Sequence, residues 1–271
     1  MMVIAAVLWG LSPLLYKQGL AAMSIVLFLL SKFAIGAIGI YLFERNKFVA
    51  IKKRFLIYFI MFGLADGLLA NYIYSLAIQK TSVLHAALIG LLVPFFVYYF
   101  ASILLKEKIH TTVVFGAIIA AFGLAIIIVG NGASDGVSSL LGDIIMVSYG
   151  IVNALLIVVG RYFLSKRKFH LPSEQLAFIQ YTASSILLVI LSFTGYAYFK
   201  TAVSVETIGL MIAAGTLLGA IPIVLYYRAA RRINAERLAD AFFITPATAM
   251  VSGVIILSEP LTVPLIIGAI V

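Results

Sequence analysis

The sequence predicts an all-α integral membrane protein with ten transmembrane helices, arranged as two inverted five-helix repeats. Three observations predict this class: the composition, the length of the apolar runs and an internal repeat. The 271 residues are 64% hydrophobic and 11% charged, with a mean hydropathy of +1.18, which lies far outside the range of soluble domains. Runs such as 57–70 and 113–129 are almost continuously apolar, which indicates helices rather than the alternating strands of a membrane barrel.

Ten segments have the length of a membrane span. A helix needs roughly 20 apolar residues to cross about 30 Å of hydrocarbon. The predicted spans are 3–20, 25–43, 55–77, 82–105, 112–130, 140–162, 175–195, 207–228, 236–257 and 261 onward. The last span reaches Val271 before it is long enough to cross, so we expect the sequence to stop inside the tenth helix of a longer chain. The halves are expected at 1–135 and 136–271.

The internal repeat relates the two halves by a shift of 152 positions without a gap. Apolar chains share leucine and valine by chance, so the informative matches are those of Tyr, Pro, Glu and Gly. These pairs are Tyr74 and Tyr226, Pro94 and Pro246, Glu107 and Glu259, and Gly116 and Gly268. Because five spans per half is an odd number, the second half must enter the membrane upside down relative to the first. Inverted repeats of this kind are a known device of secondary transporters.

The charge distribution predicts the orientation of the chain. The net charge is +9, and most of the 19 Lys and Arg residues fall in the loops 44–54 and 164–174 or near other helix ends of the same side. Cytoplasmic loops are the ones enriched in Lys and Arg. We therefore expect a multi-pass protein of the cell membrane with a cytoplasmic N-terminus. These charges are divided among short loops and form no groove-sized surface, so nucleic-acid binding is not expected.

Several local patterns resemble a known family. They are the Trp9-Gly10 pair, a basic residue before an aromatic one at Lys32-Phe33, and a Pro followed thirteen residues later by Glu in each half. Together with the ten spans, they resemble the drug/metabolite transporter superfamily, specifically its EamA-type ten-helix members. The resemblance implies a transporter of small metabolites, often an exporter. It also implies a central cavity lined by helices 1, 3, 4, 6, 8 and 9.

Polar and aromatic side chains on those helices are the candidate substrate-binding residues. Trp9, Ser12, Pro13 and Tyr16 recur at helical spacing on one face of the first span. The predicted substrate-binding residues are Trp9, Tyr16, Asn71, Tyr74, Tyr149 and Asn153. Two alternatives stay open: an interfacial aromatic belt for Trp9, and helix packing for the hydroxyl residues of the spans, including Thr245, Thr248 and Ser252.

Ionisable residues inside the spans need a partner or a function, because their insertion costs roughly 2.5–3.5 kcal/mol. The candidates are Lys32, Asp66 and His85. For Lys32 and Asp66 we expect an interhelical pair, with a substrate contact as the alternative. For His85 we expect a solvated or packing role rather than a proton relay. Asp240 is expected to pair with Arg237 within one helical turn.

The remaining expectations concern hinges and chemistry. Pro94 and Pro246 are predicted helix hinges, because proline removes a ladder hydrogen bond near the middle of a span. No catalytic residues, metal site or cofactor are expected. The expected function is secondary transport of a small solute, such as an amino acid-like compound or an amine, with export as the direction. Proton or substrate counter-transport is the expected coupling. The alternative is an integral-membrane enzyme acting on a lipid-linked substrate, but the chain lacks the clustered carboxylate and histidine motifs of such enzymes.

Overall fold

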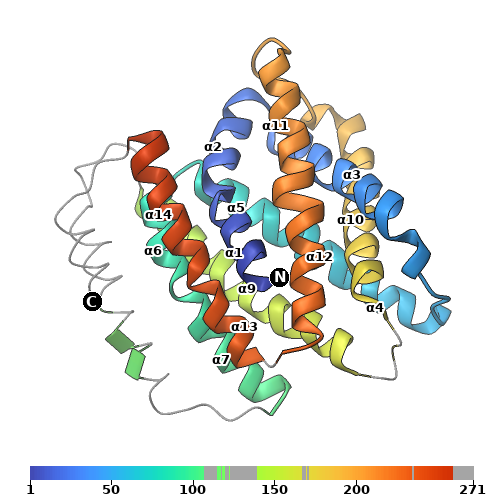
Figure 1. Ribbon diagram of the computed structural model, residues 1–271. Helices are drawn as coiled ribbons and strands as arrows, with labels where there is room; N and C mark the ends of the chain where they lie inside the picture. The colour runs from blue at the N-terminus through green and yellow to red at the C-terminus, as the bar shows by residue number, and fades with distance from the viewer. Residues whose placement is uncertain are drawn as a thin grey trace.

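A computed structural model describes residues 1–106, 115–116, 118–119, 122, 139–166, 169, 171–233 and 235–258. Within these residues, every element longer than a single bridge is a helix (Figure 1). The first half contains α1 Met2–Gly10, α2 Ser12–Ala22, α3 Ile25–Glu44, η1 Arg45–Lys47, α4 Lys53–Gly63, η2 Leu64–Ala70, α5 Asn71–Ile78, α6 Val83–Gly90 and α7 Val93–Leu104. The second half contains α9 Leu140–Ser165, α10 Ser173–Leu191, η4 Ser192–Tyr196, α11 Val205–Gly215, η5 Thr216–Ala220, α12 Ile221–Ala230, α13 Ala235–Phe242 and α14 Ile244–Leu257.

Seven of the described helical units are long and apolar enough to cross a membrane, and the bent pair α1 and α2 makes an eighth. These eight units coincide with the predicted spans 1–4 and 6–9. The predicted spans 112–130 and 261 onward lie outside the described residues, as do Glu107 and Glu259. The ten-helix count therefore stays a prediction, while the all-helical membrane class is confirmed.

The first span differs from its prediction as one continuous helix. It breaks at Leu11, and its two parts, α1 and α2, are bent by 41°. Pro13 lies in the first turn of α2. Since proline has no N–H and its ring clashes with the preceding turn, it bends the helix at this place. The bend separates Trp9 on α1 from Tyr16 on α2.

The helix breaks in the third and fourth spans of the first half recur 152 positions later in the second half, whereas the break at Leu11 has no counterpart in the continuous helix α9. The helical unit Lys53–Ile78 has its counterpart in Val205–Ala230, 152 residues later, and a π-helical stretch interrupts each of them. The short helices α6 and α13 likewise begin and end 152 residues apart. The packing partners also correspond between the halves. In the first half α6 contacts α14 and α7 contacts α9, and in the second half α13 contacts α7 and α14 contacts α1.

The two ends of the bundle are joined by different chemistry. At the end that holds Lys80, backbone contacts join the halves: Ser139 N donates to Lys80 O at 2.9 Å, and Ser24 N donates to Tyr198 O at 2.9 Å. At the end that holds Arg228, charges join them. Arg228 donates to Glu174 and to Glu44, each at 2.7 Å. We call these ends the Lys80 end and the Arg228 end.

Close packing of α10 on the first π-helical stretch holds the middle of the bundle together. A Cβ atom on Gly63 would lie 2.7 Å from Gln180 Cα, and one on Gly67 would lie 2.2 Å from Ser184 Oγ. Glycine at these two positions therefore lets α10 approach the backbone of the π-helical stretch η2. This approach brings Gln180 next to Asp66.

Candidate functional site

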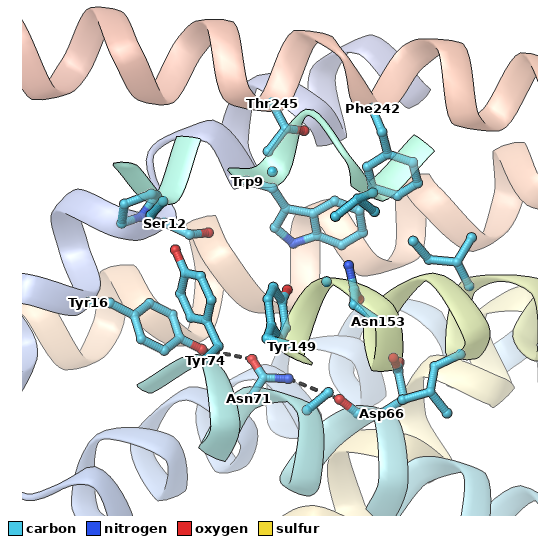
Figure 2. A pocket seen from close by; sticks show the side chains of 18 of the residues that line it. Trp9, Ser12, Tyr16, Asp66, Asn71, Tyr74, Tyr149, Asn153, Phe242 and Thr245 are labelled. Atoms are coloured by element: carbon cyan, nitrogen blue, oxygen red, sulfur yellow. Dashed lines mark hydrogen bonds between the residues drawn. The ribbon is translucent and has the colours of Figure 1, made fainter. Parts of the chain in front are cut away.

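A cavity lies between the two halves and takes its walls from both of them (Figure 2). All six residues predicted to bind substrate line it, and so do Lys32 and Asp66. The family resemblance implied walls from the predicted spans 1, 3, 4, 6, 8 and 9. All of these helices contribute residues to the walls. Two further spans also contribute: the second span, α3, through Lys32 and Phe33, and the seventh span, α10, through Gln180 and Tyr181.

Tyrosine rings form one wall of the cavity. The rings of Tyr16 and Tyr74 meet edge to face, with centroids 4.8 Å apart and an interplanar angle of 83°. Tyr149 of α9 lies 4.8 Å from Tyr74. Contacts of this geometry are attractive because the positive edge of one ring meets the negative face of another. The wall therefore joins α2 and α5 of the first half to α9 of the second.

Trp9 lies on the cavity wall and packs among aromatic rings. Its ring is stacked on Phe242 at 6.0 Å with an interplanar angle of 4°, and Tyr226 lies 5.3 Å away. The indole Nε1–H donates to Leu218 O at 3.3 Å. In an α-helix that carbonyl would accept from residue 222, but Pro222 has no N–H. The indole is thus held by two neighbouring rings, which also contact each other at 6.0 Å, and at its donor.

Lys32 lies buried beside the tyrosine wall, with 6% of its surface exposed. Its ammonium group donates to Asn71 Oδ1 at 2.7 Å and to Tyr16 Oη at 2.9 Å. Tyr16 donates in turn to Asn71 Oδ1 at 2.7 Å. An ammonium group has three donors, so one N–H of Lys32 remains beyond these two hydrogen bonds.

Asp66 is held by the second half of the chain. Its Oδ2 accepts from Gln180 Nε2 at 2.6 Å and from Tyr227 Oη at 3.3 Å. The single hydroxyl proton of Tyr227 is shared with Gln180 Oε1, which is the nearer acceptor at 2.6 Å. The other carboxylate oxygen, Oδ1, takes no hydrogen bond from the described residues and is not sealed from the cavity.

The direct pair expected between Lys32 and Asp66 is not present. No hydrogen bond or ion pair joins their side chains in the part of the chain that the structure describes. Asn71 stands between them, because it accepts from Lys32. It also donates from Nδ2 to the backbone carbonyl of Asp66 at 3.0 Å (Figure 2). The sequence places Asp66 at mid-depth of its span and Lys32 about a third of the way down its own, but the neighbours of Asp66 come from α10 and α12. Both charges consequently face the cavity.

His85 does not line the cavity. Its side chain is 2% exposed, and Nδ1 lies 3.1 Å from Asp143 Oδ2. Thr81 Oγ1 donates to the other oxygen of Asp143 at 2.5 Å. His85 is therefore not solvated, and the packing role in place of a proton relay stays a prediction. Sequence reasoning overlooked Asp143, although a carboxylate at the start of an apolar span was a visible signal.

The other expected residues are the two hinge prolines, the hydroxyl residues of α14 and Asp240. Pro246 lines the cavity, and Pro94 is buried without lining it. Thr248 and Ser252 donate to carbonyls of their own helix, while Thr245 both lines the cavity and donates to Ala6 O of α1 at 3.2 Å. Asp240 accepts a hydrogen bond from the Tyr98 hydroxyl of α7.

The comparison with known families agrees with this architecture. The model of the EamA-like transporter family matches residues 1–129 and again residues 140–271. The chain belongs to the EamA-like transporter family. Membership of this transporter family and the apolar helices identify the chain as a multi-pass membrane transporter. The alternative of a membrane-bound enzyme is therefore set aside.

One curated protein and one solved structure extend the comparison of this EamA-like transporter. A protein of Bacillus subtilis (strain 168) with the name "Uncharacterized transporter YoaV" is 24% identical over 274 residues, which cover 97% of this chain and 89% of that protein. A solved crystal structure that is 18% identical superposes with a TM-score of 0.71 and covers 99% of this chain and 91% of its own. That likeness supports the fold.

Several cavity residues of this EamA-like transporter were missed by sequence reasoning. Tyr226, Tyr227 and Phe242 looked like ordinary aromatic residues of apolar helices. Gln180 carried a clearer signal, because an amide inside a membrane span needs a hydrogen-bond partner as a charge does. Considering only charged residues left it out.

Proposed function

We propose that this EamA-like transporter moves a small organic solute across the cytoplasmic membrane by alternating access, with export as its direction. One observation carries the proposal: a single cavity receives walls from both halves and presents the two charged groups Lys32 and Asp66, which do not neutralise each other by direct contact. Groups that are costly to bury in a membrane protein generally serve a binding or transport function.

The remaining bonding capacity of these groups favours a dipolar solute. One N–H of Lys32 suits an anionic group such as a carboxylate, and Oδ1 of Asp66 suits a cationic nitrogen. The rings of Tyr74, Tyr149 and Trp9 offer faces to an apolar or aromatic part of the same molecule. An amino acid-like compound uses all three features. A simple amine uses only two of them, and a neutral polar solute uses neither charge.

We propose further that the two halves are inverted repeats, with the N-terminus in the cytoplasm. Three observations support this: helix breaks at equal repeat positions, packing partners that exchange between halves, and the family match over two separate segments. Two similar halves that are related by an axis in the membrane plane can exchange conformations, which opens one site to alternate sides. Counter-transport of protons or of a second solute molecule would then supply the driving force.

A ligand screen followed by transport tests the proposal. The purified protein is heated with amino acids, amines, nucleosides and sugars, and compounds that raise the melting temperature are then assayed by counterflow in liposomes. We expect stabilisation by dipolar compounds, because a ligand that binds only the folded state raises its stability. We also expect counterflow of the same compounds. Stabilisation and counterflow by sugars alone would contradict the assignment of the substrate class.

Charge-neutralising variants sharpen this test. Lys32→Met should abolish the preference for a carboxylate over its ester, and Asp66→Asn should abolish the preference for an amine over its hydroxyl analogue. Glu206→Gln is the matched control, because Glu206 is exposed in the first turn of α11 and does not line the cavity. Equal selectivity in all three variants would remove Lys32 and Asp66 from the binding site.

A further inference from the structure

Two short helices occupy the same place in the two halves. The helices α6 and α13 have 8 residues each and begin 152 positions apart, at Val83 and Ala235. Their last residues, Gly90 and Phe242, line the cavity. Each helix is followed four residues later by a proline, Pro94 or Pro246. Each therefore forms a short segment between the cavity and one end of the bundle.

The backbone after each short helix is suited to bending. Leu91 N donates to Leu88 O at 3.1 Å and Leu92 N donates to Ile89 O at 3.0 Å, which is the tighter spacing of a helix end. Phe243 N donates to Asp240 O at 3.2 Å with the same spacing. The proline that follows removes one more ladder hydrogen bond. Rotation at these breaks disturbs few hydrogen bonds.

A carboxylate fastens each short helix to a neighbour. Asp143 of α9 holds the start of α6 through His85 Nδ1 at 3.1 Å and through Thr81 Oγ1 at 2.5 Å. Asp240 of α13 accepts a hydrogen bond from the Tyr98 hydroxyl of α7. Since His85 and Asp143 are both nearly fully buried, the first contact can break only when α6 separates from α9.

The two short helices start at opposite ends of α9. Asp143 lies in the first turn of α9, whereas Arg161, near its last turn, donates from Nε to Ile233 O at 3.2 Å, just before α13 begins. Helical rise places these two contacts about 27 Å apart along α9. The start of α6 therefore lies at the Lys80 end, and the start of α13 lies at the Arg228 end.

We propose that α6 and α13 are the two gates of the cavity, one at each end, with Asp143 and Asp240 as their latches. This inference rests on the proposed alternating access and adds the moving parts. Release of His85 and Thr81 from Asp143 lets α6 pivot at Leu91–Leu92 and opens the Lys80 end. Release of Asp240 from Tyr98 lets α13 pivot at Phe243 and opens the Arg228 end.

Cysteine accessibility tests each gate separately. The chain has no cysteine, so Ala249→Cys on the cavity wall gives a single reporter for a membrane-impermeant thiol reagent. The reagent is added to the outside of intact cells or to inverted vesicles. In this background, Asp143→Asn should speed labelling from the Lys80 end only. Tyr98→Phe should speed it about fivefold from the Arg228 end only, the factor that corresponds to loss of one hydrogen bond of about 1 kcal/mol.

Matched controls separate gating from general loosening. Tyr99→Phe alters the neighbouring tyrosine, which is 55% exposed, and should leave both labelling rates unchanged. Ser24→Ala weakens another contact at the Lys80 end, with Tyr198, and should also leave them unchanged. If Asp143→Asn does not fold, as judged by its melting temperature, Thr81→Val replaces it.

The outcomes are distinct. Acceleration from one end for each latch variant supports the two gates. Unchanged rates, or equal acceleration from both ends, would overturn the proposal. Because labelling needs no substrate, side-specific acceleration without any counterflow would support the gates while rejecting the proposed transport function.

Discussion

The backbone carbonyls of Asp66 and Leu218 occupy equivalent positions in the two halves, 152 residues apart, and each accepts a hydrogen bond from a side chain of the cavity wall. Asn71 Nδ2 donates to Asp66 O at 3.0 Å, and Trp9 Nε1 donates to Leu218 O at 3.3 Å. Both carbonyls lie in π-helical stretches, where the regular ladder is interrupted and carbonyls become available. The repeat thus presents an accepting carbonyl in each half, but only the first half has a charged side chain at that position, Asp66, where the second half has Leu218.

Trp9 should report substrate binding by fluorescence. It is the only tryptophan, so its emission comes from one site, and a solute that packs against its ring in the cavity should shift or quench it in a saturable way. Trp9→Ala should weaken apparent affinity by about 1–2 kcal/mol, because stacking area is lost. Quenching by brominated lipid, combined with no response to any transported solute, would place Trp9 in the lipid belt instead.

The indole donor should be coupled to Pro222. Trp9→Phe keeps a ring but removes the hydrogen bond to Leu218 O, which we expect to cost about 1 kcal/mol of stability. In a Pro222→Ala background, residue 222 regains an N–H four positions after Leu218, so the same change should cost less. Melting temperatures of the four proteins of this cycle measure the coupling. Equal losses in both backgrounds would show that the bond does not contribute.

Gly67→Ala should destabilise the bundle. The added Cβ would lie 2.2 Å from Ser184 Oγ, and such overpacking costs about 1–3 kcal/mol. Adding Ser184→Ala removes the clashing oxygen and should restore part of the loss. Gly209→Ala is the control, since nothing lies within 4 Å of its Cβ, and it should be neutral or stabilise by roughly 0.5–1 kcal/mol. Thermal unfolding in detergent distinguishes these cases.

The charges at the Arg228 end should contribute unequally. Arg228 joins Glu44 and Glu174 while only 26% of its side chain is exposed, whereas the side chain of Lys47 is 52% exposed. We expect Arg228→Gln to cost about 1–2 kcal/mol and Lys47→Gln less than about 0.5 kcal/mol. The Arg228 effect should shrink in high salt because ions screen partly exposed pairs. Equal losses at low salt would argue against the ion-pair explanation.

Orientation can be measured with two exposed positions. Ser165 is the last residue of α9, at the Arg228 end, and Thr201 lies in the loop before α11 at the Lys80 end, and each is replaced by cysteine in turn. From the distribution of basic residues, an impermeant thiol reagent outside intact cells should label position 201 and leave position 165 unlabelled. The reverse pattern would place the N-terminus outside.

Local sequence information was sufficient for the membrane class, for the positions of the eight described spans and for part of the cavity walls. Each of these follows from a property of a short segment: apolar length, the spacing of polar residues along one helix, or a proline. The six predicted substrate-binding residues all line the cavity for this reason. The break at Leu11 also had its cause in the sequence, at Pro13, although a continuous helix was expected.

Only the tertiary structure decided which polar groups meet. Asp66 bonds to Gln180 and Tyr227 rather than to Lys32, and His85 meets Asp143. In a soluble protein, a one-sided apolar stripe indicates which face of a helix is buried. Helices in lipid are apolar all round, so their rotation and their neighbours are set by close packing at small residues and by hydrogen bonds between distant segments. Those contacts depend on the whole bundle, and no single stretch of this sequence specifies them.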